Sequence, residues 1–384
     1  MKNWKRLLAL SLAGIMALSL FACKSGDSTD DPSAAPSEEV SDDPYADSTP
    51  EIVADLSMGP LEFSAGMSAG DTVITVNGED VSADLFLYWL DYNCYYFASY
   101  YSMFGLNLSD FADDLLEDAA YFCVSEVLLR QKAAELGCLP TDAQVQEARD
   151  SLDDETHGLL QSAYGLSDES INYLILSDAY YENVMAALTH EPDEQELVDY
   201  MAAQDFYRVK HILLKTIDDN SDPLPDDEIA AKRSQAEELL AELQAASDLP
   251  ALFDQRMNEL SEDGRDSSGS LYAPDGYLAY PGQMDSAFEE ASLALEDGGL
   301  SDIVEGFYGF HIILRLPLTP FTDDERAEYE ATFRDDAMND LIDQWQDAAD
   351  VTRADSLSTL NAADFFNRLT AYQQALMAQE EGEG

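Results

Sequence analysis

The chain has 384 residues, of which 46% are hydrophobic, and it carries a formal net charge of −59 at pH 7. This length and hydrophobic content are sufficient for two or three domains with cores of their own. The 78 acidic residues far outnumber the 19 basic ones and would repel phosphates, which excludes nucleic acid as a partner. The same charge suits basic or unfolded polypeptide partners, although a strongly solvated acidic surface explains it equally well.

Residues 1–22 are predicted to be a targeting segment. Three basic residues precede an apolar run over residues 7–22 that is short for a helix spanning a bilayer. The run ends in Leu-Phe-Ala-Cys, which resembles a bacterial lipobox and implies cleavage before Cys23 and diacylation of its thiol. Two acyl chains anchor a protein stably to a membrane. An ordinary secretory signal or a simple anchor helix is the alternative, and either also places the protein outside the cytoplasm.

Residues 23–70 are dominated by Ser, Asp, Glu, Pro and Ala. Because so few apolar residues cannot bury a core, we predict an acidic disordered tether over this range.

Three further cysteines follow the lipobox: Cys94, Cys123 and Cys138. They form no Cys-x-x-Cys pair and show no zinc-site spacing, and the four histidines are scattered along the chain. We therefore expect buried thiols, with a single disulfide as the alternative, and neither a metal nor a cofactor.

A hairpin and several helices are predicted between residues 71 and 204. Residues 71–82 alternate apolar and polar side chains around Asn77-Gly78, a typical sequence for a tight hairpin turn. Apolar residues at helical spacing predict helices over residues 83–104, 115–136, 141–152 and 167–188. This arrangement resembles the N-terminal chaperone domain of secreted foldases of the trigger-factor, SurA and PrsA types.

The helix predicted over residues 83–104 carries more rings than one buried stripe needs. Four of them lie off the main line of aromatic residues: Tyr88, Tyr95, Phe97 and Tyr101. One interpretation of these rings is a surface for unfolded clients. The alternative is that a C-terminal helix covers them with Tyr329, Phe333 and Trp345.

Two β-like runs far apart in the sequence each contain a histidine followed by three aliphatic residues. They begin at His211 and at His311. Between them, Met284 and Phe288 stand one turn apart on one face of a predicted helix.

These segments resemble the parvulin family of peptidyl-prolyl isomerases. The six parts of the family pattern occur in the family's order between about residues 205 and 317: His211-Ile212-Leu213, Ser261-Glu262-Asp263, Gly269-Ser270-Leu271, Gly282-Gln283-Met284 with Phe288-Glu289-Glu290-Ala291, Gly298-Gly299-Leu300-Ser301, and Gly309-Phe310-His311-Ile312-Ile313. One part alone would be weak evidence, but all of them in order form a specific signal.

The resemblance implies an α+β fold in which a parvulin domain is inserted in a mostly α-helical chaperone domain. The parvulin domain, a small antiparallel sheet with surrounding helices, is expected over residues 205–318. The chaperone domain would comprise residues 71–204 and the C-terminal helices of residues 319–384, packed on each other. Insertions of this kind succeed where the ends of the inserted domain lie close together.

The resemblance also implies the site. Leu271, Met284 and Phe288 would form a proline pocket, so Phe288→Ala should reduce isomerase activity far more than stability. Without the family, Met284 and Phe288 would be interpreted as ordinary core residues. His211 and His311 correspond to the paired histidines of the family, which either tune the site or form a structural pair.

Asp263 stands where the family has a cysteine or an aspartate, and it either faces the substrate carbonyl or only caps its loop. Four departures from the pattern leave turnover open: Tyr272, the long loop over residues 273–277, Leu278, and Gly306 in a place where threonine is common. The acidic loop over residues 215–222 lacks the basic cluster of phosphate-directed parvulins, which excludes phosphoserine–proline specificity.

We therefore expect a lipid-anchored extracytoplasmic foldase that isomerises X–Pro bonds in unfolded or newly secreted polypeptides, as a monomer or a homodimer. The first alternative is a client-holding chaperone with a weak or inactive parvulin domain. A solute-binding lipoprotein is the second alternative, but the long α/β sheet pattern of that class is missing from the sequence.

Overall fold

The computed structural model describes residues 52–101 and 104–383. The targeting segment, Cys23 and most of the predicted tether therefore lie outside the described residues. The chain divides into two compact units, one formed by residues up to His190 together with those from Asp335 onward, and the other by Glu191–Arg334. We call them the helical unit and the sheet unit.

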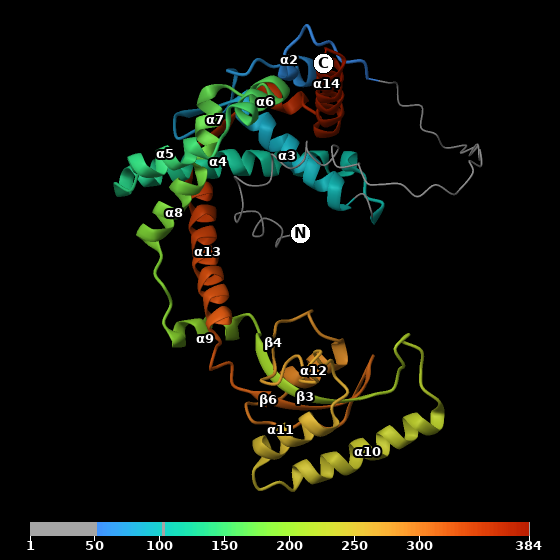
Figure 1. The fold of residues 1–384 in the computed structure, drawn as a ribbon. Helices are drawn as coiled ribbons and strands as arrows, with labels where there is room; N and C mark the ends of the chain where they lie inside the picture. Colours follow the sequence, from blue (N-terminus) through green and yellow to red (C-terminus); the bar gives the residue numbers. More distant parts are fainter. Residues whose placement is uncertain (1–51, 102–103, 384) are drawn as a thin grey trace, which may run out of the picture. The chain divides into compact units, whose positions relative to one another are not determined.

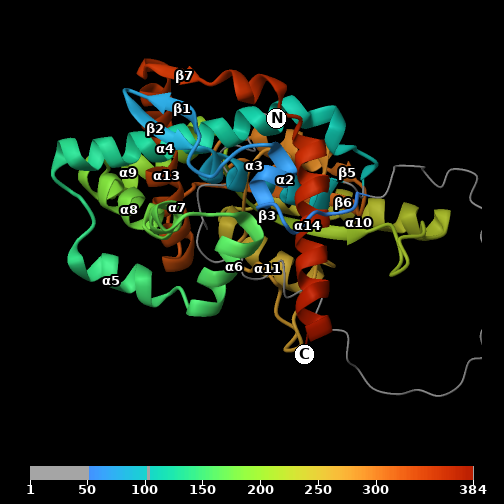
Figure 2. The same cartoon turned by 90° about the horizontal axis from the view of Figure 1, so that it is seen from above.

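The helical unit is built from the helices α2 (Pro60–Ala65), α3 (Ala83–Tyr101), α4 (Ala112–Leu136), α5 (Asp142–Asp150), α6 (Asp154–Tyr164), α7 (Asp168–Ile175), α8 (Ser177–Leu188) and α14 (Ala362–Glu383), with 3-10 turns η2 (Leu108–Phe111) and η3 (Asp355–Thr359). Helix α3 packs on α4, and α14 contacts both of them as well as α2 (Figures 1 and 2). The single helix predicted over residues 167–188 is in fact two, since α7 ends at Ile175 and α8 begins at Ser177. The Ser177 hydroxyl lies 3.1 Å from the buried Glu126 carboxylate.

The predicted hairpin is present as β1 (Thr72–Val76) and β2 (Glu79–Ser82). Asn77 and Gly78 both have positive φ angles of 52° and 87°, as a tight hairpin turn requires. A short strand that the sequence did not predict, β7 (Val351–Arg353), pairs with the free edge of β1 and completes an antiparallel sheet of order β2–β1–β7.

The prediction of a disordered tether is wrong for its last part. Residues 60–65 form α2, which begins at Pro60 and is followed by Gly66, a C-cap glycine with a left-handed backbone conformation. Leu61 is only 4% exposed in the main core, and the Phe63 ring lies 5.9 Å from that of Tyr372 in α14. A few apolar residues suffice here because a neighbouring helix buries them.

The aromatic helix α3 is buried differently from our expectation. Tyr88 and Phe97, two of the four rings considered for client binding, are only 7% and 3% exposed, whereas Tyr100 in the same helix is 56% exposed. Two of the four additional rings, Tyr88 and Phe97, are therefore core residues.

The helix that covers α3 is also not the one we named. Helix α14 contacts α3, and its Phe365 and Leu369 belong to the same buried cluster. Of the predicted covering residues, only Trp345 packs against this core, while Tyr329 contacts Phe206 in the sheet unit.

The sheet unit holds α9 (Glu194–Ala203), β3 (Tyr207–Lys215), α10 (Asp226–Gln244), α11 (Leu249–Leu260), β4 (Tyr277–Ala279), α12 (Ser286–Leu293), β5 (Val304–Gly306), β6 (Gly309–Leu316) and the beginning of α13 (Asp323–Ala348). Its four strands form an antiparallel sheet of order β4–β3–β6–β5. A small antiparallel sheet with helices around it, set between helical segments, confirms the predicted α+β class.

Helices cover both faces of this sheet, which explains the near-continuous apolar character of β3 and β6. On one face, Ile212 and Ile312 pack with Phe253 of α11 and with α10. On the other, Val209 and Ile313 pack with Phe288 of α12. Figure 1 shows α10 and α11 on one side of the strands and α12 on the other.

The structure also describes the cysteines and the apolar character of the helices. Cys94, Cys123 and Cys138 are free thiols, the first two of them buried. No helix in the described part of the chain is long and apolar enough to cross a membrane.

The burial of α2 gives a first prediction. Leu61→Ala should lower the free energy of unfolding of the helical unit by about 2–5 kcal/mol, because it removes buried methyl groups from a packed core. Urea unfolding measures this change. Val53→Ala is the matched control, since Val53 lies in the same segment but is 80% exposed. Equal unfolding midpoints for the two variants would show that α2 is not part of the core.

Candidate active site

The candidate site lies on the face of the sheet that α12 covers, and the pairing of β3 with β6 creates it. His211 is directly opposite Ile313, and Leu213 is opposite His311. Because alternate residues of a strand point to the same face, both histidines project to one side from diagonal positions.

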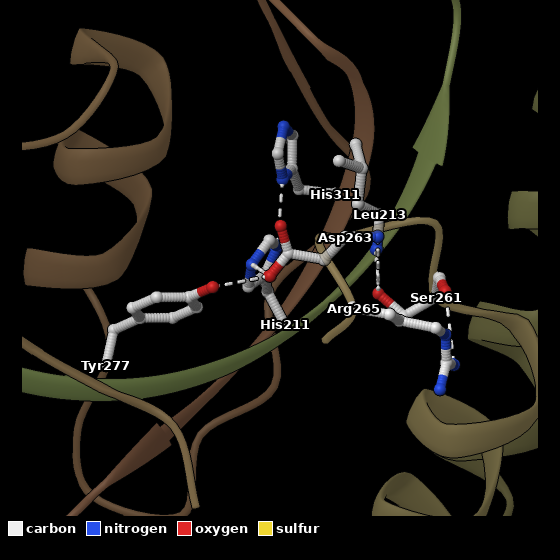
Figure 3. Close-up of polar contacts among 7 residues, drawn as sticks. All are labelled: His211, Leu213, Ser261, Asp263, Arg265, Tyr277 and His311. Atoms are coloured by element: carbon white, nitrogen blue, oxygen red, sulfur yellow. Dashed lines mark hydrogen bonds and ion pairs between the residues drawn. The ribbon is translucent and has the colours of Figure 1, made fainter. Parts of the chain in front are cut away.

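The two imidazoles are in direct contact. Their Nδ1 atoms are 3.1 Å apart and their ring centroids 5.2 Å apart. On the far side of His211, its Nε2 lies 3.2 Å from Oδ2 of Asp263 (Figure 3). The structure therefore brings together the three polar residues predicted from the sequence, in the order Asp263, His211, His311.

Asp263 reaches this position because its loop is bonded to the end of β3. The backbone N–H of Leu213 donates to the Ser261 hydroxyl at 3.1 Å, and its carbonyl accepts from the N–H of Glu262 at 2.8 Å. Arg265 holds the loop that follows by donating to the carbonyl oxygens of Gly269 and Asn258. The Ser261 hydroxyl thus connects the loop to the end of β3.

A fourth polar residue, Tyr277, was missed by the sequence analysis. Its hydroxyl donates to the same Oδ2 of Asp263 at 2.6 Å, and its ring centroid lies 5.6 Å from that of His211. The signal available in the sequence was the unusual length of the loop before it, which gives no indication of where the tyrosine points.

Asp263 is held as a carboxylate. Burial alone would raise its pKa, but the hydrogen bonds from His211 and Tyr277 outweigh burial and lower the pKa well below its usual range. Tyr277 is shifted in the opposite direction, because burial and its bond to Asp263 raise its pKa above the usual value. At neutral pH the tyrosine is therefore the donor and the aspartate the acceptor.

The charge of Asp263 sets the direction of the hydrogen bonds. Its carboxylate requires a hydrogen on Nε2 of His211. With both rings neutral, Nδ1 of His211 then accepts the hydrogen on Nδ1 of His311. Burial, followed by the proximity of His211, lowers the pKa of His311 to about 4 and keeps that ring neutral.

Gly306, one of the departures from the family pattern, lies next to His311, the last residue of the hydrogen-bonded series Asp263–His211–His311. Nε2 of His311 is buried and has no hydrogen-bond partner among the described residues. A Cβ at Gly306 would stand 3.3 Å from that nitrogen and 3.0 Å from Oδ1 of Asp285. A side chain at position 306 would therefore contact both the His311 ring and the Asp285 carboxylate. Glycine makes no such contact.

Phe288 forms the apolar wall next to the histidines. Its ring meets both imidazoles edge-on, with centroids 5.1 Å from His211 and 5.3 Å from His311. Phe288 is 4% exposed and packs with Tyr207, while the half-buried Met284 lies against the same cluster.

The predicted pocket of Leu271, Met284 and Phe288 is not assembled as expected. Leu271 is bridged to Arg265 and packs with Ile212, Phe253 and Met257 in the cluster on the opposite face of the sheet. The expectation for Phe288→Ala also changes, because removing a buried ring costs about 3–5 kcal/mol of stability.

The arrangement suits a reaction without a covalent intermediate. Asp263 has a side chain that is 26% exposed and Met284 is half-buried, so both reach the accessible edge of the site, whereas His211 and Phe288 lie beneath it. A fixed negative charge beside an apolar wall can distinguish two electronic forms of a bound amide. Within residues 52–101 and 104–383, no group of three or more metal-ligating side chains could hold a metal ion.

The buried neutral state of His311 predicts a pH dependence of stability. Its folded pKa of about 4 lies below the value of about 6.5 expected for an unfolded histidine. As the pH falls, the unfolded state therefore takes up a proton before the folded state does. The contribution of His311 to the free energy of unfolding is complete above about pH 6.5 and is lost as the pH falls toward 4.

Native-state hydrogen exchange of β3 and β6 peptides measures this effect. The free energy of opening should fall by about 2 kcal/mol more in the wild type than in His311→Gln between about pH 7 and pH 4.5. His157→Gln, in α6 of the helical unit, is the control and should behave like the wild type. The same pH dependence in wild type and His311→Gln would contradict a buried neutral His311.

Comparison with known proteins agrees with this geometry. Residues 195–315 match the family of PPIC-type PPIase domains. The foldase protein PrsA of Staphylococcus aureus (strain bovine RF122 / ET3-1) is 29% identical over 223 residues, which cover 53% of this chain and 67% of the relative. PrsA of strain Newman matches with the same identity of 29% and the same coverage of 53% and 67%.

Solved structures of PrsA proteins are also similar. PrsA from Bacillus cereus is 21% identical, covers 79% of this chain and 99% of its own length, and has a TM-score of 0.31. PrsA from Bacillus subtilis is 18% identical, with coverages of 68% and 85% and a TM-score of 0.22. The match over residues 195–315 identifies a parvulin-type peptidyl-prolyl isomerase domain, and the chain is similar to the PrsA foldases.

Proposed function

We propose that this protein is an extracytoplasmic foldase that is anchored to a membrane through Cys23 and isomerises X–Pro bonds in newly secreted or unfolded polypeptides. The observation that carries the proposal is the series Asp263–His211–His311 beside the Phe288 ring, within a PPIC-type domain.

The proposed chemistry follows from the barrier to rotation about an X–Pro bond. Amide resonance makes this rotation take tens to hundreds of seconds without a catalyst, and twisting the bond destroys the resonance. A catalyst must therefore bind the twisted amide more tightly than the planar one. Met284 and Phe288 would hold the proline ring and exclude water, which disfavours the more polar planar form.

Asp263 would add an electrostatic contribution to the same effect. Planar amide resonance places negative charge on the carbonyl oxygen, so a carboxylate near that oxygen destabilises the planar form relative to the twisted one. His211, His311 and Tyr277 would keep this carboxylate in place. The loop over residues 215–222 carries three aspartates and a single lysine, so the proposed substrates are not phosphorylated.

The proposed domain organisation is an isomerase domain over residues 205–318 between chaperone segments 71–204 and 319–384. Support comes from the division of the chain, because the helical unit consists of two separate stretches and the sheet unit of the single stretch between them. Basic or unfolded polypeptides are the proposed clients, and the acidic surface would attract the basic ones. A homodimer is also proposed, and light scattering of the purified chain tests it.

A second candidate function, a client-holding chaperone with little isomerase activity, is favoured by a specific surface. Three aromatic side chains near the end of α3 are exposed by 43%, 56% and 72%: Tyr95, Tyr100 and Phe104. Exposed rings at one end of a helix offer apolar area to an unfolded chain.

The isomerase proposal is tested on a proline-containing peptide with the full chain. Phe288→Leu should lower kcat/KM by at least about tenfold, because the smaller side chain no longer covers the histidine pair. Phe253→Leu is the matched control, since Phe253 is fully buried on the opposite face of the same sheet. Equal activity of the two variants, at equal stability, would place the proline site elsewhere.

The chaperone surface is tested by suppression of client aggregation. Replacing Tyr95, Tyr100 and Phe104 by serine should abolish suppression and leave peptide isomerisation unchanged, because these rings belong to the helical unit. The control replaces three exposed leucines of the same unit, Leu136, Leu139 and Leu188, by serine. Loss of suppression in both variants, or in neither, would remove α3 as the client surface.

The anchor is tested by mass spectrometry of the membrane fraction of a bacterial host. The protein should lack residues 1–22 and carry a diacylated Cys23, whereas Cys23→Ser should keep the segment uncleaved. Cys138→Ser is the control and should remain lipidated. An intact targeting segment on the membrane-bound wild type would reject the lipid anchor.

A further inference from the structure

The long loop at residues 273–277 delivers Tyr277 to the site by a turn that only glycine permits. Gly276 has a φ of +95°, and a Cβ there would stand 2.5 Å from the carbonyl oxygen of Val209. The backbone can therefore pass close against β3, and the next residue, Tyr277, begins β4 opposite Val209. The departure from the family pattern in this loop thus has a defined structural consequence.

Tyr277 and His211 bind the same oxygen from two sides. The tyrosine hydroxyl donates to Oδ2 of Asp263 at 2.6 Å, and Nε2 of His211 lies 3.2 Å from that oxygen. The tyrosine ring also lies against the imidazole, at a centroid distance of 5.6 Å (Figure 3). The carboxylate, the histidine and the tyrosine therefore form one closed cluster.

We propose that Tyr277 is a positioning residue for the isomerisation, acting through Asp263 on the histidine pair. This inference rests on the proposed function of the same site. The Asp263 side chain is 26% exposed and could rotate toward water if His211 were its only side-chain donor. The hydroxyl holds Oδ2 where His211 needs its acceptor, and this fixes the tautomer of His211 and then that of His311.

The residue type suits this role. Burial and the bond to Asp263 raise the pKa of Tyr277, so the hydroxyl retains its proton at neutral pH and remains a donor. Phenylalanine would keep the ring contact with His211 and lose only the hydrogen bond, so a single substitution separates the two contributions.

The kinetic test uses the full chain and a proline-containing peptide. Tyr277→Phe should lower kcat about tenfold with little change in KM, which corresponds to the loss of one hydrogen bond to a charged group. In an Asp263→Ala background, the same substitution should have no further effect, because the residue through which Tyr277 acts is missing. Tyr280→Phe, on an exposed residue next to the same strand, is the control and should match the wild type.

A second measurement does not depend on activity. The chain has only four histidines, so 15N-histidine labelling allows the ring signals of His211 to be assigned. Its Nε2 proton should exchange with water about tenfold faster in Tyr277→Phe than in wild type or Tyr280→Phe, since its acceptor is less firmly held.

The outcomes are distinct. The proposal would be overturned if Tyr277→Phe showed the wild-type exchange rate and the wild-type kcat. It would also be overturned if Tyr277→Phe lowered kcat by the same factor in the wild type and in the Asp263→Ala background. If the wild type shows no isomerase activity but Tyr277→Phe accelerates the exchange, the proposed function fails while the positioning of Asp263 by Tyr277 is supported.

Discussion

The antiparallel pairing of β3 with β6 is the constraint on which the candidate site depends. It joins segments 100 residues apart and fixes which side chains share a face. A shift of one residue in this register would move one histidine to the opposite face and separate it from the other. Apolar residues around both histidines, on both faces of the sheet, specify the register, so the packing of the core also sets the geometry of the polar groups.

The two faces of the sheet have separate tasks. The face under α10 and α11 is apolar and gives stability without contributing a polar group to the site. The face under α12 combines an apolar cluster around Phe288 with two buried imidazoles, and the cost of burying them is limited by the hydrogen bonds that they share. Substitutions on the face under α10 and α11 can therefore change stability without altering a polar group of the site, whereas substitution of Phe288 changes both activity and stability.

The sequence predicted the parts of the site that lie in regular elements with a local pattern. His211, His311 and Phe288 are on strands and a helix whose periodicity fixes their direction. Met284 was predicted on the same helix as Phe288, but it lies just before α12, which begins at Ser286. Leu271 lies in a loop, and Tyr277 is the first residue of the short strand β4. The directions of their side chains depend on a bridge to Arg265 and on the turn at Gly276, which sequence periodicity does not indicate. Helix α2 and the buried rings of α3 were misjudged for a related reason, because their burial depends on α14, nearly three hundred residues later in the chain.

The strand register makes the two histidines share one hydrogen bond. The most direct measurement is the scalar coupling across that bond between the two Nδ1 nuclei in the 15N-labelled protein. We predict a measurable coupling, a single proton between the nitrogens, and an imidazole of His311 that stays neutral down to about pH 4. The absence of coupling, together with a His311 that titrates near the usual histidine pKa of about 6.5, would contradict the account.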